Sequence, residues 1–193
     1  MDADDMIMIS VDDHLVEPPD LFENHLPDAY AQRDEAPRVH RRRDGSDVWM
    51  FNGQKIPNVG LNAVAGRPRE EYGIEPTAFD EMRPGCWNIH DRIKDMNAGG
   101  VLGSMCFPSF PGFSGRVFSA VDDKDFALAV LRAYNDWHVD EWCGSYPGRF
   151  IPMGLVPLWD PEVAADEVRR LARKGVHSIT FTENPATLGY DSF

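Results

Sequence analysis

Cysteine is scarce in this chain of 193 residues, which contains three: Cys86, Cys106 and Cys143. Their number is odd and no two of them form a CxxC pair, so neither a disulfide framework nor a zinc knuckle is indicated. We therefore expect reduced thiols.

Basic residues are few relative to acidic ones. The chain has 19 Lys and Arg against 32 Asp and Glu, which gives a formal net charge of −13. Nucleic-acid binding depends on clustered positive charge, so no nucleic-acid partner is expected. No apolar run approaches the roughly 20 residues that span a bilayer, and the N-terminus is acidic. We expect a cytoplasmic protein without a membrane partner.

Glycine-rich phosphate loops are absent as well, since neither GxGxxG nor GxxxxGK[ST] occurs. This disfavours a self-contained open α/β domain that binds a small ligand at its strand ends. There is also no internal repeat of fixed period. What the chain does have is 42% hydrophobic residues, enough for one sizeable core.

Short apolar runs predict four strands, at 7–11, 101–107, 150–158 and 176–181. The first run is almost continuously apolar, which is typical of a strand buried on both faces. Pro152 weakens the third run as a strand.

Amphipathic helices are predicted between these runs, at 89–98, 123–142 and 161–174. Asn88 and Asp160 suit the position before the first turn of the first and last of these helices. Alternation of strands and helices favours a parallel sheet with crossover helices.

The segment between the first two strands predicts a hairpin at 39–51 with an Asp-Gly turn, followed by a long loop at 56–85. We interpret residues 1–193 as a single domain and residues 38–85 as a hairpin and loop insertion within it.

Asp12 and His14 follow the first strand and are two residues apart, so their side chains are expected on one face. A carboxylate and an imidazole in this arrangement can bind one divalent metal ion. The alternative is a loop carboxylate beside a hydrogen-bonded structural histidine. The other histidines have no second ligand nearby in sequence and are interpreted as structural or surface residues.

The segment around this pair resembles a known family. Residues 9–22 read ISVDDHLVEPPDLF, similar to the opening of the metal-dependent amidohydrolase-related family that includes the aminocarboxymuconate-semialdehyde decarboxylase-like proteins. Further similar segments follow in the family's order. They are GCWNIHDRIKDM at 85–96, YNDW at 134–137, PGRF at 147–150 and GLVPL at 154–158.

The resemblance implies a (β/α)8 barrel of the TIM type with its site at the carboxyl ends of the strands. It makes Asp12 and His14 the metal ligands of the first strand, although most members carry His or Glu in place of Asp12. The family's other ligands, a histidine on the fifth strand and an aspartate on the eighth, lie beyond residue 193. We therefore expect the N-terminal half of such a barrel, with about four parallel strands.

Several further residues are candidates for the site because they lie near the ends of strands. Glu17 is expected to orient His14 or to lie close to the site, with a surface loop role as the alternative. The substrate pocket is predicted to include residues that follow the second and fourth strands. These are Phe107, Pro108, Ser109, Thr182, Glu183 and Asn184.

The first functional hypothesis is a metal-dependent hydrolase or non-oxidative decarboxylase that acts on a small carboxylated or cyclic organic substrate. Zinc is the expected ion, with manganese or iron as alternatives. The second hypothesis is a catalytically inactive, truncated half-barrel that serves only as an assembly or interaction module. Its open sheet edges would favour homo-oligomers.

Overall fold

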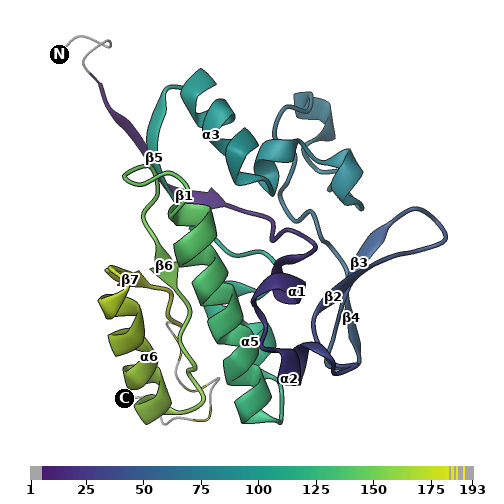
Figure 1. The fold of residues 1–193 in the computed structure, drawn as a ribbon. Coiled ribbons are helices and arrows are strands. Elements are labelled where there is room, and N and C mark those ends of the chain that lie inside the picture. Colours follow the sequence, from purple (N-terminus) through teal and green to yellow (C-terminus); the bar gives the residue numbers. More distant parts are fainter. Residues whose placement is uncertain (1–5, 183, 185, 187–188, 190–193) are drawn as a thin grey trace.

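Parallel pairing between strands from distant parts of the chain organises the fold (Figure 1). β1 (Met8–His14) pairs in parallel with β5 (Val101–Phe107). β6 (Met153–Gly154) pairs in parallel with β7 (Ser178–Ile179). The predicted parallel arrangement is therefore confirmed for these two pairs.

The structure is a computed structural model that describes residues 6–182, 184, 186 and 189. A single parallel bridge between Ser104 and Phe150 connects the two strand pairs. The Ser104 N–H donates to the Arg149 carbonyl over 3.0 Å, and the Ile151 N–H donates to the Ser104 carbonyl over 2.9 Å. The chain that leads into β6 thus lies directly beside β5.

The third and fourth strands are shorter than predicted, since each has two residues. Pro152 and Pro157 lie on either side of β6 and have no N–H to donate to a ladder. The prediction of a strand over 150–158 was therefore wrong in extent. The second strand, Val101–Phe107, has the predicted bounds.

Helices cover the strands and begin at the predicted caps. α3 (Ile89–Ala98) follows Asn88, whose side chain accepts two backbone N–H groups of the first turn. Asp160 does the same for α6 (Pro161–Arg173). Of the helices in the described part of the chain, none combines the length and the apolarity that a membrane crossing requires.

The long central helix changes its geometry in its second half. α5 (Lys124–Asp136) is α-helical and continues into a π-helical segment, Trp137–Cys143. Together they occupy the range predicted as one helix over 123–142. His138 is fully buried in the wider segment and accepts the backbone N–H of Met153 over 3.4 Å. Burial lowers the pKa of His138 to about 4, so it is a neutral structural histidine, as the sequence suggested.

The predicted hairpin is present and has a third strand. β2 (Arg38–Arg41), β3 (Asp47–Phe51) and β4 (Gln54–Ile56) form an antiparallel sheet. Trp49 and Phe51 are buried beneath it, and the Trp49 ring stacks on Phe110 with 4.5 Å between ring centroids. This aromatic contact joins the hairpin to the chain that follows β5.

Shorter helical segments complete the described chain. They are α1 (Leu21–His25), α2 (Asp28–Ala31), α4 (Arg116–Ser119), and 3-10 turns at Arg69–Glu71, Phe79–Glu81, Pro84–Cys86 and Phe113–Gly115.

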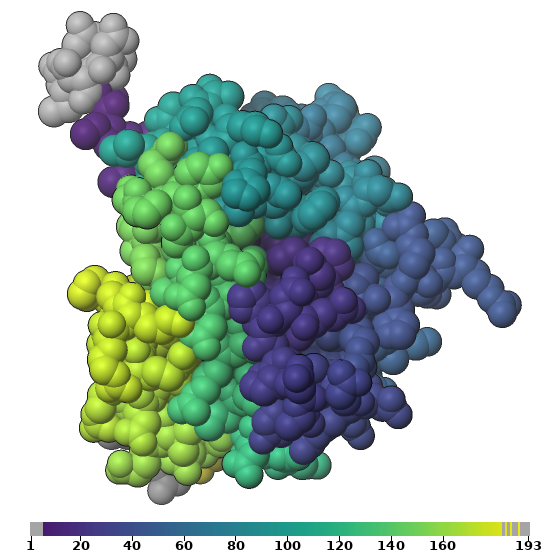
Figure 2. Space-filling view, viewed as in Figure 1, coloured from purple at the N-terminus to yellow at the C-terminus, as the bar shows by residue number. Residues whose placement is uncertain are grey.

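β1 differs from the prediction in its burial. Met8, Ile9 and Val11 are 56%, 51% and 61% exposed, so the expectation of a strand buried on both faces was wrong. In the described residues β1 pairs only with β5, which leaves its other edge uncovered. Figure 2 shows the beginning of β1, in purple, standing out from the body of the molecule.

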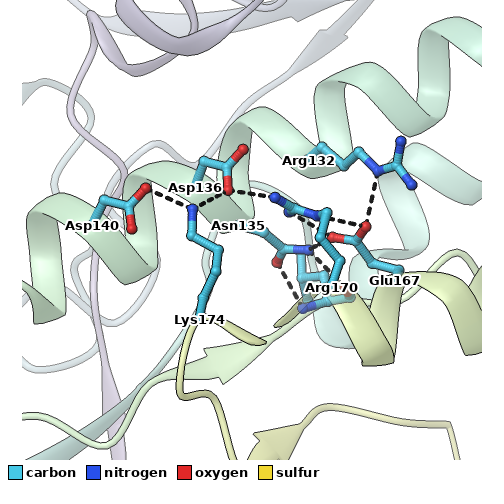
Figure 3. A network of polar contacts seen from close by, with 8 residues as sticks. Arg132, Asn135, Asp136, Asp140, Glu167, Arg170 and Lys174 are labelled. Atoms are coloured by element: carbon cyan, nitrogen blue, oxygen red, sulfur yellow. Dashed lines mark hydrogen bonds and ion pairs between the residues drawn. The ribbon is translucent and has the colours of Figure 1, made fainter. Parts of the chain in front are cut away.

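A buried polar network fastens α6 to α5 (Figure 3). Glu167 is fully buried and accepts hydrogen bonds from Arg132 over 2.9 Å, from Asn135 over 2.9 Å and from two nitrogens of Arg170. Burial by itself would raise the pKa of Glu167, but the hydrogen bonds from Arg170, Arg132 and Asn135 outweigh it and lower the pKa. Glu167 is therefore held as a charged group between two helices.

Asn135 extends this network to the strand layer. Its side chain donates to the Leu155 carbonyl and accepts the Leu155 N–H, both over 2.8 Å. The amide thereby pairs with the backbone in the way that a neighbouring strand would. Nearer the surface, Lys174 and Arg170 both contact Asp136.

Replacing Glu167 by Ala should lower the free energy of unfolding by about 2 to 4 kcal/mol, because Arg132, Asn135 and Arg170 would lose a shared buried acceptor. Urea denaturation of the purified variant measures this change. The control is Asp166→Ala on the same helix, which removes an exposed pair with Arg169 and should change the free energy by less than about 0.5 kcal/mol. Equal effects of the two substitutions would contradict the role given to Glu167.

Candidate functional site

Asp12 and His14 lie together at the carboxyl end of β1, as the sequence predicted. The distance from Asp12 Oδ1 to His14 Nε2 is 4.0 Å, and the two side chains are 87% and 48% exposed. Both donors are thus open to solvent and close enough to bind one metal ion.

A β-bulge precedes His14. Ser10 pairs with Ser104 and Asp13 pairs with Cys106, so β1 uses one residue more than β5 between these two pairs. Bulges redirect side chains and are frequent beside active sites. The side chain of Asp13 points toward Ser104, whose hydroxyl donates to Asp13 Oδ2 over 2.7 Å.

Glu17 lies behind the loop that follows β5. Its side chain is fully buried and accepts the backbone N–H groups of Ser109 over 3.0 Å and of Phe110 over 2.8 Å. Burial raises the pKa of Glu17 to about 7, and these hydrogen bonds offset that increase only in part. The geometry thus shows Glu17 anchoring a loop close to the site, and the alternative of a surface loop role is wrong because the side chain is buried.

Of the residues predicted at the end of β5, Phe107 lies beside His14. Phe107 is opposite His14 in the strand register, with 6.0 Å between ring centroids. The Ser109 hydroxyl donates to the Leu15 carbonyl over 2.6 Å, and Pro108 is buried between Phe107 and Ser109. Phe113, which the sequence analysis missed, stacks on Phe107 at 6.4 Å and is 60% exposed.

Of the residues predicted after the fourth strand, Thr182 and Asn184 are described, and they follow the carboxyl end of β7. Thr182 is half-buried and its hydroxyl accepts the Asn184 N–H over 3.3 Å. Glu183 lies outside the described residues. The Thr182 and Asn184 contribution to a substrate pocket stays a prediction.

Asp12 and His14 together could provide part of the ligands of a metal site. Across residues 6–182, 184, 186 and 189, no group of three or more His, Cys, Asp or Glu side chains is arranged to hold a metal ion. A catalytic zinc site uses three protein ligands and water. Asp12 and His14 can therefore fill two ligand positions, and the remaining positions need donors from elsewhere.

One polar residue behind the site, Arg92, was missed by the sequence analysis. Arg92 on α3 contacts Asp13 Oδ1 at 3.5 Å and also donates to the His14 carbonyl. Arg92 belongs to the segment 85–96 that resembles the family. It is 78 residues from His14, so the sequence alone does not indicate that the two residues are in contact.

Comparison with known proteins identifies the family. A model of the amidohydrolase family matches residues 14–189. This chain belongs to the amidohydrolase family. The resemblance seen in the sequence is thereby confirmed. The candidate site of this amidohydrolase lies at the carboxyl end of β1, its first parallel strand.

Among curated proteins, gamma-resorcylate decarboxylases from Rhodococcus jostii (strain RHA1) and Rhizobium sp. (strain MTP-10005) are 28% and 27% identical to this amidohydrolase over 110 residues. Each match covers 56% of this chain and 32% of the relative. This chain therefore matches about a third of the length of these relatives.

Solved structures show the same fold. An amidohydrolase from Mycobacterium avium subsp. paratuberculosis K-10 superposes with a TM-score of 0.64 at 20% identity, covering 89% of this chain and 48% of that one. The 5-carboxyvanillate decarboxylase of Novosphingobium aromaticivorans, with bound manganese and 3-methoxy-4-hydroxy-5-nitrobenzoic acid, gives 0.52 at 23% identity, covering 92% and 42%. These matches establish an α/β fold of the amidohydrolase barrel type.

The buried carboxyl of Glu17 predicts a specific pH dependence. Because its pKa rises from 4.5 to about 7 on folding, the folded chain binds this proton more tightly than the unfolded chain does. The free energy of unfolding should therefore decrease between pH 4.5 and 7, by up to about 3 kcal/mol from this group.

Urea denaturation at several pH values, on wild type and Glu17→Gln, measures this effect. The variant should lose the decrease in that pH range, whereas Glu23→Gln, which changes an exposed glutamate on α1, should keep it. An identical pH dependence in wild type and Glu17→Gln would show that Glu17 does not change its protonation state on folding.

Proposed function

We propose that this chain provides the first-strand part of a divalent-metal site in an enzyme that hydrolyses or decarboxylates a small carboxylated or cyclic organic substrate. The observation that carries the proposal is the exposed Asp12 and His14 pair, 4.0 Å apart, at the carboxyl end of a parallel strand. Active sites of barrel enzymes lie at this end of their strands.

The relatives favour non-oxidative decarboxylation of an aromatic acid. Two curated relatives are gamma-resorcylate decarboxylases, and a solved structure of similar fold is a carboxyvanillate decarboxylase. The rings of Phe107 and Phe113, stacked beside His14, offer a flat apolar wall that suits an aromatic ring.

Manganese is the ion that we favour, with zinc and iron as alternatives. The carboxyvanillate decarboxylase holds manganese, and the exposed carboxylate of Asp12, together with water, is a ligand type that suits this ion. When bound, such an ion polarises a carboxylate or carbonyl group, or lowers the pKa of a bound water molecule. Asp12 and His14 would supply its ligands from this chain.

We further propose that the described chain forms half of the barrel, with four parallel strands in the order β1, β5, β6 and β7. The parallel bridge between Ser104 and Phe150 supports this order. Exposed apolar side chains on these strands support a missing covering layer. They are Met8, Val11, Leu102 and Ile179, and Phe181 just after β7 is exposed as well.

The second candidate function is an assembly or interaction module without catalysis. The observation that favours it is the same exposed apolar sheet. In addition, the described residues bring together two ligands where a zinc site needs three. In this alternative the open strand edges pair with another polypeptide, including a second copy, and no metal is bound.

Manganese titration of the purified chain, followed by the electron paramagnetic resonance signal of free Mn²⁺, tests the proposal. We expect about one ion per chain, with affinity at least about tenfold weaker in Asp12→Ala and in His14→Ala because each loses a ligand. His40→Ala, which changes an exposed histidine of the hairpin, should bind as wild type does.

Molar mass measured by light scattering on the same samples separates the two candidates. Metal binding that depends on Asp12 and His14 supports the enzyme, whatever the oligomeric state. A metal-free oligomer whose mass is unchanged by either substitution would support the assembly module instead.

A further inference from the structure

A polar cluster lies behind the candidate metal ligands and joins three elements. It consists of Asp13 on β1, Ser104 on β5 and Arg92 on α3, and we call it the Asp13 bracket. The Ser104 hydroxyl donates to Asp13 Oδ2 over 2.7 Å, and an Arg92 terminal nitrogen lies 3.5 Å from Asp13 Oδ1. The bracket thus fixes Asp13 from two sides.

The bracket also holds the backbone of His14 on both sides. The His14 N–H donates to Asp13 Oδ1 over 2.9 Å, and the His14 carbonyl accepts a hydrogen bond from Arg92. Since both polar groups of this backbone are engaged, the direction of the His14 Cα–Cβ bond is set by contacts outside the metal site.

Other contacts at this end of β1 act on the residue that follows His14. The Leu15 N–H donates to the Phe107 carbonyl over 3.1 Å, and the Leu15 carbonyl accepts the Ser109 hydroxyl over 2.6 Å. The bulge interrupts its ladder between Ser10 and Asp13, and among the described strands only β5 pairs with it. The Asp12 side chain is 87% exposed and the His14 side chain is 48% exposed, so packing constrains them little beyond the contact between the His14 and Phe107 rings. The Asp13 bracket is therefore the constraint that acts on the backbone of His14 itself.

Arg92 is well placed to act in this way because it is removed from solvent. Its side chain is 15% exposed, its Nε is buried without a hydrogen-bond partner in the described structure, and its guanidinium lies 5.8 Å from the centre of the Trp142 ring. Charge-assisted hydrogen bonds are stronger and more directional where water is excluded.

We propose that Arg92 and Asp13 are positioning residues, which hold the end of β1 so that Asp12 and His14 present their donor atoms to one metal ion. This inference rests on the proposed function, in which Asp12 and His14 bind a metal ion. It adds two residues that act on these ligands without contacting the ion. Groups that orient metal ligands typically contribute about ten- to a hundredfold to metal affinity.

The test compares Arg92→Met with a matched arginine at the other end of β5. Arg149 donates to the carbonyls of Leu102 and Val101 and to Asn97 of α3, so it also fastens β5 to α3, away from the site. Arg149→Met is therefore the control for a general loss of anchoring.

Two readouts are measured on wild type and both variants: Mn²⁺ affinity by titration, and hydrogen–deuterium exchange of the His14 and Leu15 amides. We expect Arg92→Met to weaken Mn²⁺ binding about tenfold or more and to speed the exchange of both amides. Arg149→Met should change neither. Arg92→Lys should be intermediate, because an ammonium can contact Asp13 but lacks the second arm that reaches the His14 carbonyl.

Unchanged exchange of the His14 amide in Arg92→Met would overturn the positioning role, as would an equal loss of Mn²⁺ affinity in Arg149→Met. If the wild-type chain itself binds no Mn²⁺, the proposed metal function fails for this chain. The exchange comparison then still decides whether the bracket holds the end of β1.

Discussion

The parallel pairing of β1 with β5 is the interaction on which the rest of this structure depends. It places His14 opposite Phe107 and brings the loop after β5 within reach of Glu17. It also sets Asp13 against Ser104, so that Arg92 can join the strand end to α3. Without this pairing the aromatic wall would not lie beside the two candidate ligands.

Much of the fold could be predicted from sequence because its signals are local. Helix caps such as Asn88 and Asp160 act within one turn, and the predicted helices follow them. The Asp12 and His14 pair was found for the same reason, since two residues on one strand share a face wherever the strand lies. Strand extents were less predictable, as the two-residue β6 shows, because each depends on a partner far away in sequence.

The parts that were missed depend on contacts across the sheet. Arg92 is 78 residues from His14, and only the tertiary structure brings its guanidinium to that carbonyl. Likewise, Glu17 lies 92 residues from Ser109, so its role in anchoring the loop cannot be read from the Val-Glu-Pro segment. The exposure of β1 was missed because an apolar run shows that a strand is suited to burial, not that its covering layer is present in the described residues.

The side chains of β1 differ between its apolar, exposed part and its end, where a charged pair is partly buried. This difference helps to choose between the two candidate functions. On the helix side a charged pair, Arg92 and Asp13, is largely withdrawn from water, at a cost in desolvation that an apolar pair would avoid. A module that only assembles through its apolar strands needs no fixed backbone direction at His14, which is what this charged pair provides. A metal site gains a fixed backbone behind His14, so the placement of these charges favours the enzyme over the silent module.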